Sequence, residues 1–301
     1  MDASGGSSHF EVVTKSSSNQ GDKKTHKRVN FHSMFGFGDS LTDTGNMLIS
    51  MQAQNASRMP IQGRVPYGET FFRKPVGRFS DGRLLVDLLE ALSKALIFLG
   101  EIGGNDYNYA FGNFISSDRI HDLVPNVITQ IKNAIQMMIE SGVKYAVVQS
   151  AYPMGCIPLY KRVYANAARD AQGCLVDVNN VVHQHNVQLS QLLDNLTVYY
   201  NNTVQFIFWD AEKAFMELYT NPHQYGFTYR ERPCYDISEY FLNLAMNITG
   251  VEACTDPSTY IIWDGPHPTE AMNRAVLDLF YTQGYVKPYP NFLTSNSRVI
   301  V

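Results

Sequence analysis

Short apolar stretches alternate with longer segments of helical periodicity along most of this chain. Four apolar stretches, 29–37, 95–99, 145–149 and 204–209, have the length and the β-branched or aromatic content of buried strands. A fifth apolar run, 260–263, leads into a polar loop.

Apolar side chains recur at helical spacing in most of the intervening segments. Strands that alternate with helices predict an α/β fold, a three-layer sandwich in which helices cover both faces of a mostly parallel sheet. The expected helices are 84–92, 123–139, 178–196, 211–219 and 269–283.

The stretch GFGDSLTDTGN, 36–46, places a serine directly after the first predicted strand. Gly36 and Gly38 are expected to permit a backbone turn that presents Ser40 at the strand end. A serine oxygen needs a base before it becomes a good nucleophile. Taken alone, however, Gly-Asp-Ser is also typical of a turn or a helix cap.

A candidate base lies near the other end of the chain, in WDGPHPTEAMN, 263–273. Asp264 precedes His267 by three residues, so a turn can aim the carboxylate at an imidazole nitrogen. The alternative interpretation is a pair of turn and capping residues around Pro266 and Pro268. Ser, Asp and His together favour nucleophilic catalysis.

A third motif, EIGGNDYNY, 101–109, follows the second predicted strand. Asn105 is therefore expected at the carboxyl edge of the sheet, where open α/β sheets bind ligands. An asparagine amide at this edge can donate a hydrogen bond to a developing oxyanion. An ordinary turn residue is the alternative for Asn105, but three motifs in this order make coincidence a poor explanation.

Together these motifs resemble the GDSL esterase/lipase family of plants, part of the SGNH hydrolase superfamily, from about residue 35 to 289. In its detailed sequence the chain is most similar to the branch that includes acetylajmalan and sinapine esterases. Four further stretches carry the resemblance: PYGETFF at 66–72, GRFSDGR at 77–83, PMGCIPLY at 153–160 and DAEKAF at 210–215.

The resemblance implies an SGNH or flavodoxin-like hydrolase and assigns roles to the motif residues. Ser40 would be the nucleophile, His267 the general base and acid, and Asp264 the residue that orients the imidazole. Asn105 and the backbone N–H of Ser40 would form the oxyanion hole. The expected substrate is a small-molecule or lipid ester. If water accepts the acyl group the protein is an esterase, and if an alcohol accepts it the protein is an acyltransferase.

One family motif, resembling N-x-A-x-x-G, has no counterpart in this sequence, so the third oxyanion donor, a glycine, is not found. The predicted helix that begins at Leu84 runs directly into SKALIFLGEIGGND. We therefore expect an internal deletion near 91–93 and a sheet that lacks one strand. An alternative function follows, a truncated and catalytically impaired family member, because losing one oxyanion donor costs about a hundred- to a thousandfold in rate.

The composition is that of a globular protein: 301 residues, 45% hydrophobic and 17% charged, with a net charge of −4. Ser40 and His267 bracket nearly the whole chain, so we expect one domain over 31–301 and a disordered polar leader over 1–30. No basic stripe follows residue 30, and no apolar run is long enough to span a bilayer. Neither nucleic-acid binding nor stable membrane insertion is expected, and no oligomeric state is predicted.

The cysteines and sequons point to the secretory pathway. By resemblance, Cys156 would pair with Cys174 and Cys234 with Cys254, and the protein would be secreted or vacuolar, although residues 1–30 lack the apolar segment of a signal peptide. Four reduced thiols are the alternative. N-x-S/T sequons begin at Asn55, Asn195, Asn201 and Asn247.

No metal or other cofactor is expected. The cysteine spacing does not match a zinc site. His183 and His185, two residues apart on a predicted helix, face different directions and so make a poor metal pair.

Overall fold

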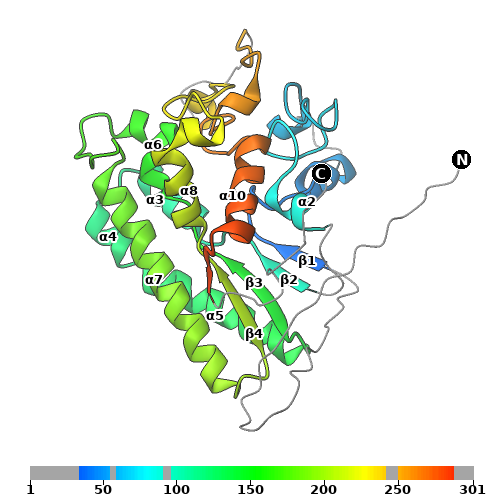
Figure 1. Ribbon diagram of the computed structural model, residues 1–301, viewed down its shortest axis with the longest axis vertical. Helices are drawn as coiled ribbons and strands as arrows, with labels where there is room; N and C mark the ends of the chain where they lie inside the picture. Colours follow the sequence, from blue (N-terminus) through cyan, green and yellow to red (C-terminus); the bar gives the residue numbers. More distant parts are fainter. Residues whose placement is uncertain (1–33, 55–58, 91–95, 242–249, 288–301) are drawn as a thin grey trace, which may run out of the picture.

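A five-stranded sheet with the order β1-β2-β3-β4-β5 forms the centre of the computed structural model (Figure 1). The structure describes residues 34–54, 59–90, 96–241 and 250–287. The first four strands are parallel, and β5 runs antiparallel to β4. The strands are β1 (Met34–Phe37), β2 (Leu96–Leu99), β3 (Tyr145–Gln149), β4 (Gln205–Trp209) and β5 (Val286–Lys287).

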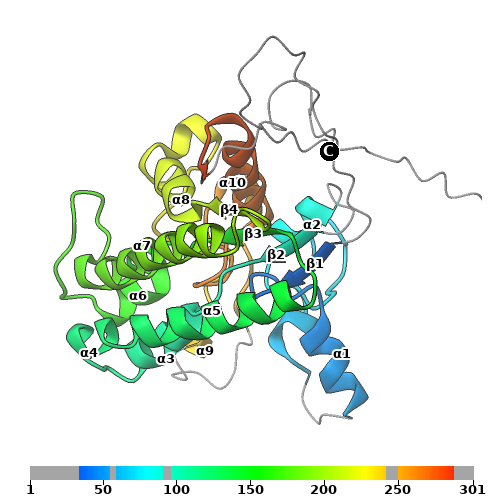
Figure 2. The ribbon, with the colours of Figure 1, turned by 90° about the horizontal axis from the view of Figure 1, so that it is seen from below.

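Successive side chains of each central strand enter two different apolar cores. Val148 packs with α5 and α7 on one face, whereas Val147 packs with α2, α8 and α10 on the other. Figure 2 shows these helices on opposite sides of the strands. The longer helices are α1 (Asn46–Ala53), α3 (Gly104–Gly112), α5 (Val124–Glu140), α7 (Val176–Tyr199), α8 (Ala211–Thr220) and α10 (Glu270–Thr282). The shorter ones are α2 (Leu85–Glu90), α4 (Ser117–His121), α6 (Pro158–Val163) and α9 (Ser238–Phe241).

The predicted three-layer α/β fold with a mostly parallel sheet is confirmed. β3 coincides with the predicted strand, and α5, α7, α8 and α10 lie within three residues of the predicted helices. The run 260–263 forms only isolated bridges, Tyr229 with Tyr260 and Ile262 with Pro268, and joins no strand of the sheet. A strand of two residues, as in β5, is too short for alternation to reveal it.

β1 lies at the edge of the sheet, and one of its faces is uncovered. Phe35 and Phe37 are 57% and 48% exposed, although their register partners in β2, Ile97 and Leu99, are buried beneath the α5 and α7 layer. On the other face, a Cβ at Gly36 would approach Val86 of α2 to 3.0 Å. The described helices thus cover β1 on one side only.

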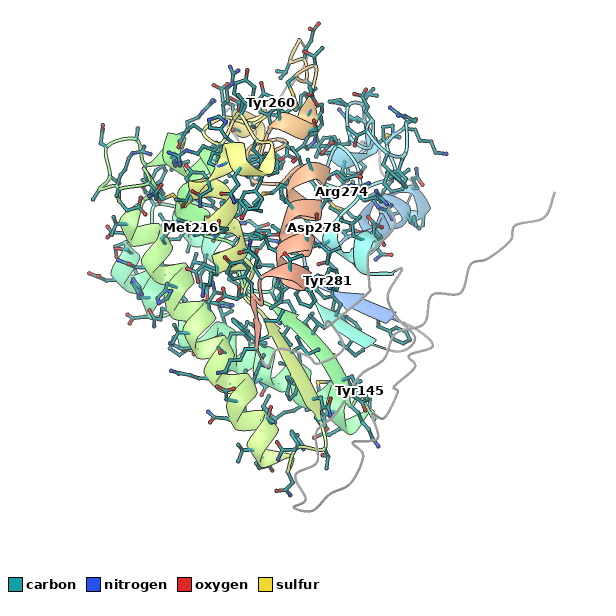
Figure 3. All side chains as sticks on the ribbon, viewed as in Figure 1. Tyr145, Met216, Tyr260, Arg274, Asp278 and Tyr281 are labelled. Atoms are coloured by element: carbon teal, nitrogen blue, oxygen red, sulfur yellow. A yellow bond between two sulfur atoms is a disulfide. The ribbon has the colours of Figure 1, made fainter. Side chains whose placement is uncertain are left out.

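Side-chain links tie the loops to this framework. The predicted disulfides Cys156–Cys174 and Cys234–Cys254 are both present. Each closes a loop of about 20 residues, which contributes about 3 kcal/mol in the chain-entropy model. Glu270 at the start of α10 bonds both Arg83 and Arg274, and Arg274 is labelled on this helix in Figure 3.

Several predictions concern residues outside the described ranges: the leader 1–30, the junction at 91–93, and the sequons at Asn55 and Asn247. Asn195 and Asn201 are described and exposed, so their glycosylation stays a prediction. No helix in the described part of the chain is both long and apolar enough to cross a membrane.

Candidate active site

The turn after β1 presents Ser40 at the carboxyl edge of the sheet. The carboxylate of Asp39 accepts the N–H of Leu41 at 2.9 Å, and its backbone oxygen accepts the N–H of Thr42 at 2.9 Å. Thr42 is buried against Gly38, where an added Cβ would lie 2.9 Å from the Thr42 Cβ. Neither Gly36 nor Gly38 has a positive φ. A Cβ at Gly38 would therefore strain the turn, as predicted, and it would do so by its collision with Thr42. Gly36 lies within β1 and not in the turn.

Asp43 closes the same segment by capping the next helix. Its carboxylate accepts the backbone N–H groups of Gly45, Asn46 and Met47, at 2.6–3.1 Å, at the start of α1. A carboxylate is stabilised at a helix N-terminus by the unpaired N–H groups and the helix dipole. Asp43 therefore braces the turn.

The loop after 260–263 places an aspartate and a histidine side by side. Asp264 is fully buried, and its carboxylate oxygens each lie 2.9 Å from His267 Nδ1. The backbone N–H of His267 also donates to Asp264, at 3.1 Å. Gly265 between them has a φ of 124°, a conformation that favours glycine.

Ser40 and His267 meet although 227 residues separate them in the chain. Ser40 Oγ lies 2.9 Å from His267 Nε2. With Nδ1 donating to Asp264, Nε2 is the unprotonated nitrogen and accepts a hydrogen bond from the Ser40 hydroxyl. The structure thus brings the three predicted residues Ser40, His267 and Asp264 into one hydrogen-bonded chain.

Asn105 lies in the first turn of α3, which starts at the carboxyl end of β2. Its side chain is exposed, and its Oδ1 accepts a hydrogen bond of 2.8 Å from Asn108. That bond fixes the amide orientation and leaves Nδ2 as the donor toward a ligand. Its role in an oxyanion hole stays a prediction.

Sequence reasoning missed two aromatic residues that hold the triad. Tyr67 is fully buried, and its hydroxyl donates to Asp264 Oδ2 at 2.7 Å. Phe79 stacks on the imidazole of His267, with ring centroids 4.6 Å apart. Both belong to stretches that carry the family resemblance, but their spacing along the chain gives no sign of either contact.

We expect Tyr67→Phe to lower kcat for an ester substrate about tenfold and to leave KM nearly unchanged. The size of the effect follows from the lost hydrogen bond, because a hydrogen bond to a charged group is worth about 1.5–3 kcal/mol. KM should not change, because Asp264 stabilises the imidazolium only during the reaction and not when substrate binds. Steady-state kinetics with an aryl ester measures both constants. Tyr164→Phe is the matched control, since its hydroxyl donates to the backbone of Phe111, away from the triad. A drop of equal size in the control would remove the specific role of Tyr67.

The two histidines of α7 have separate environments. His185 is buried and bonds the hydroxyl of Tyr107, whereas His183 is exposed beside Glu212. Burial lowers the pKa of His185 to about 4, so this side chain is neutral at physiological pH. Within the described ranges, no group of three His, Cys, Asp or Glu side chains is placed to hold a metal ion.

Comparison with known proteins places the chain in a family. A family model described as GDSL-like Lipase/Acylhydrolase matches residues 91–280. The chain belongs to this GDSL lipase/acylhydrolase family. It is similar to three Arabidopsis thaliana proteins that are named GDSL esterase/lipase At1g31550, At1g28610 and At1g28640.

These relatives are 30%, 27% and 29% identical, and the matches cover 86%, 90% and 90% of this chain. They also cover 86%, 91% and 90% of the respective relatives. This chain is therefore a member of a family of carboxylic ester hydrolases. The names do not test the predicted acetylajmalan and sinapine esterase branch, which stays a prediction.

The alignment lengths add an observation about the chain itself. The alignment with At1g31550 extends over 341 positions, which exceeds the 301 residues of this GDSL chain by 40. At least that many positions of the relative therefore have no counterpart here.

Proposed function

We propose that this chain is a serine esterase that hydrolyses carboxylic esters of small molecules or lipids through an acyl-enzyme. The hydrogen-bonded series Ser40–His267–Asp264 carries the proposal, because it supplies a nucleophile, a base and a group that orients the base. Family membership supports the ester as substrate.

The reaction would proceed in two transfers. Ser40 Oγ attacks the ester carbonyl carbon as its proton passes to His267 Nε2; the C–O bond to the alcohol then breaks, and the alcohol leaves with that proton. Water next attacks the carbonyl carbon of the acyl-serine and gives a proton to His267. The C–O bond to Ser40 then breaks, Ser40 Oγ takes that proton back from His267, and the acid is released. The backbone N–H of Ser40 and the amide of Asn105 would stabilise the oxyanion in both steps.

Hydrolysis of a small aryl ester such as p-nitrophenyl acetate by the parent chain and by Ser40→Ala tests the proposal. We expect the variant to lose several orders of magnitude in rate, since the nucleophile is removed and only weak residual catalysis remains. Equal rates for the two chains would overturn the assignment. Product analysis with added alcohol separates hydrolysis from acyl transfer.

A second candidate function is a truncated and catalytically impaired family member. Three observations support an internal deletion near 91–93: at least 40 positions of At1g31550 without a counterpart in this chain, the family match that begins at residue 91, and the uncovered Phe35 and Phe37 on β1. A deleted strand and helix beside β1 would account for the exposed face. Sequencing the transcript across this junction distinguishes a natural short message from a faulty gene model.

A secreted or vacuolar location is likewise a proposal. It rests on the two disulfides, which persist in oxidising compartments, and on the exposed sequons at Asn195 and Asn201.

A further inference from the structure

A buried carboxyl group lies directly behind the nucleophile turn. Glu101 follows β2 at the carboxyl edge of the sheet and is 6% exposed. Its Oε2 accepts the backbone N–H of Tyr152, just beyond β3, at 3.2 Å. Glu101 thus links the ends of two neighbouring strands beneath the site.

A second carboxylate, that of Asp39, faces the same point from the turn after β1. Both side chains approach Gly104, the first residue of α3. A Cβ on Gly104 would collide with Glu101 Oε1 and would lie 3.7 Å from Asp39 Oδ2. The two carboxyl groups therefore both lie beside Gly104, in the region between Ser40, which follows Asp39, and Asn105, which follows Gly104.

Glu101 is buried, whereas Asp39 is half-buried, and the negative charge of Asp39 disfavours ionisation of Glu101. Burial, and secondarily the charge of Asp39, raises the pKa of Glu101 to about 8. Burial also raises the pKa of Asp39, although the bond from Leu41 and the charge of His267 oppose that rise.

The other titratable groups around Glu101 are phenols, Tyr152 beyond β3 and Tyr160 of α6. Burial, assisted by the charge of Glu101, raises the pKa of both phenols, so they stay neutral. Neither phenol supplies a positive charge that would stabilise a Glu101 carboxylate. At neutral pH the proton therefore stays on Glu101.

We propose that Glu101, in its neutral form, is a positioning residue that holds the Ser40 turn against the start of α3, and that loss of its proton switches the site off. This inference rests on the proposed esterase function. An ionised Glu101 would repel Asp39 and so loosen the turn that carries Ser40. It would also place a second negative charge beside the developing oxyanion, which opposes the transition state.

Glu101→Gln tests the proposal, since glutamine keeps the shape and the acceptor for Tyr152 but does not ionise. The readouts are the rate of Ser40 labelling by a fluorophosphonate and ester hydrolysis, both from pH 6 to 10. We expect the parent rates to fall about tenfold between pH 7 and 9.5. Glu101→Gln should stay within about threefold of the parent at pH 7 and keep that rate at pH 9.5.

Thermal unfolding gives a readout that does not depend on activity. The pKa of Glu101 is raised in the folded state, so the folded chain holds more protons than the unfolded chain between pH 4.5 and about 8. The contribution of protonated Glu101 to the free energy of unfolding is fully present below pH 4.5 and is lost as the pH rises to about 8. Between these values the parent Tm should fall about 5 °C further than the Tm of Glu101→Gln.

Glu212→Gln is the matched control, because burial also raises the pKa of Glu212, a carboxyl on α8 that bonds Asn186. It should keep the parental alkaline decline. The inference would be overturned if the labelling rate of Glu101→Gln showed the same alkaline decline as the parent. It would also be overturned if Glu101→Gln lost as much of the labelling rate at pH 7 as Glu101→Ala does. Absence of Ser40 labelling in the parent at every pH would instead overturn the proposed esterase function, and the positioning role with it.

Discussion

Replacing His267 with glutamine should lower the rate of ester hydrolysis by about four orders of magnitude or more. In serine hydrolases, loss of the base costs as much as loss of the whole triad, because the residues act as one unit. Here His267 Nε2 accepts from Ser40 at 2.9 Å, and the described contacts show no second base on that oxygen. Glutamine fills similar space but does not take up the proton.

The measurement is release of p-nitrophenol from p-nitrophenyl acetate at pH 7.5, with circular dichroism to show that the variant is folded. His183→Gln is the matched control: this exposed histidine lies on α7 beside Glu212 and should leave the rate unchanged. A folded His267→Gln chain that keeps a tenth of the parent rate would contradict the proposed mechanism.

Grafting a segment at the proposed internal deletion should raise the rate of the parent chain about a hundred- to a thousandfold. The graft would replace 91–93 with a segment that contains the N-x-A-x-x-G motif of the family. An N-x-A-x-x-G glycine in that stretch would add the third oxyanion donor, and one donor is worth about 3–4 kcal/mol in the transition state. The same segment should cover Phe35 and Phe37 on β1 and lower binding of an apolar dye.

The matched control for the graft carries proline in place of that glycine, since proline has no N–H to donate. We expect it to fold like the graft, cover β1 and gain none of the rate. A folded graft that hydrolyses the ester no faster than the parent would contradict the proposal that an internal deletion impairs this chain.

The sequence predicted the triad because each member lies in a short motif at the end of an apolar run. Asp264 and His267 are three residues apart, so local turn geometry is enough to join them. Tyr67 escaped prediction because its partner Asp264 is 197 residues away, and only the fold brings them together. Glu101 lies four residues before Asn105 in the sequence, but nothing in the sequence shows that it is buried near Asp39.

The central strands and long helices were predictable for a similar reason: their periodicity reports directly which face is buried. The start of α3 was not, because Gly103 and Gly104 disfavour a helix on propensity alone. These glycines serve close packing, since a Cβ on Gly103 would approach Val127 to 2.6 Å. Tertiary contact therefore overrides local preference where the helix must approach the active site.

Fluorophosphonate labelling of the purified chain beside Ser40→Ala tests the central claim most directly, with circular dichroism to show that both chains are folded. The geometry of Ser40, His267 and Asp264 predicts that the parent is labelled and that Ser40→Ala is not. A folded parent chain that takes no label, or equal labelling of the two chains, would contradict an activated Ser40.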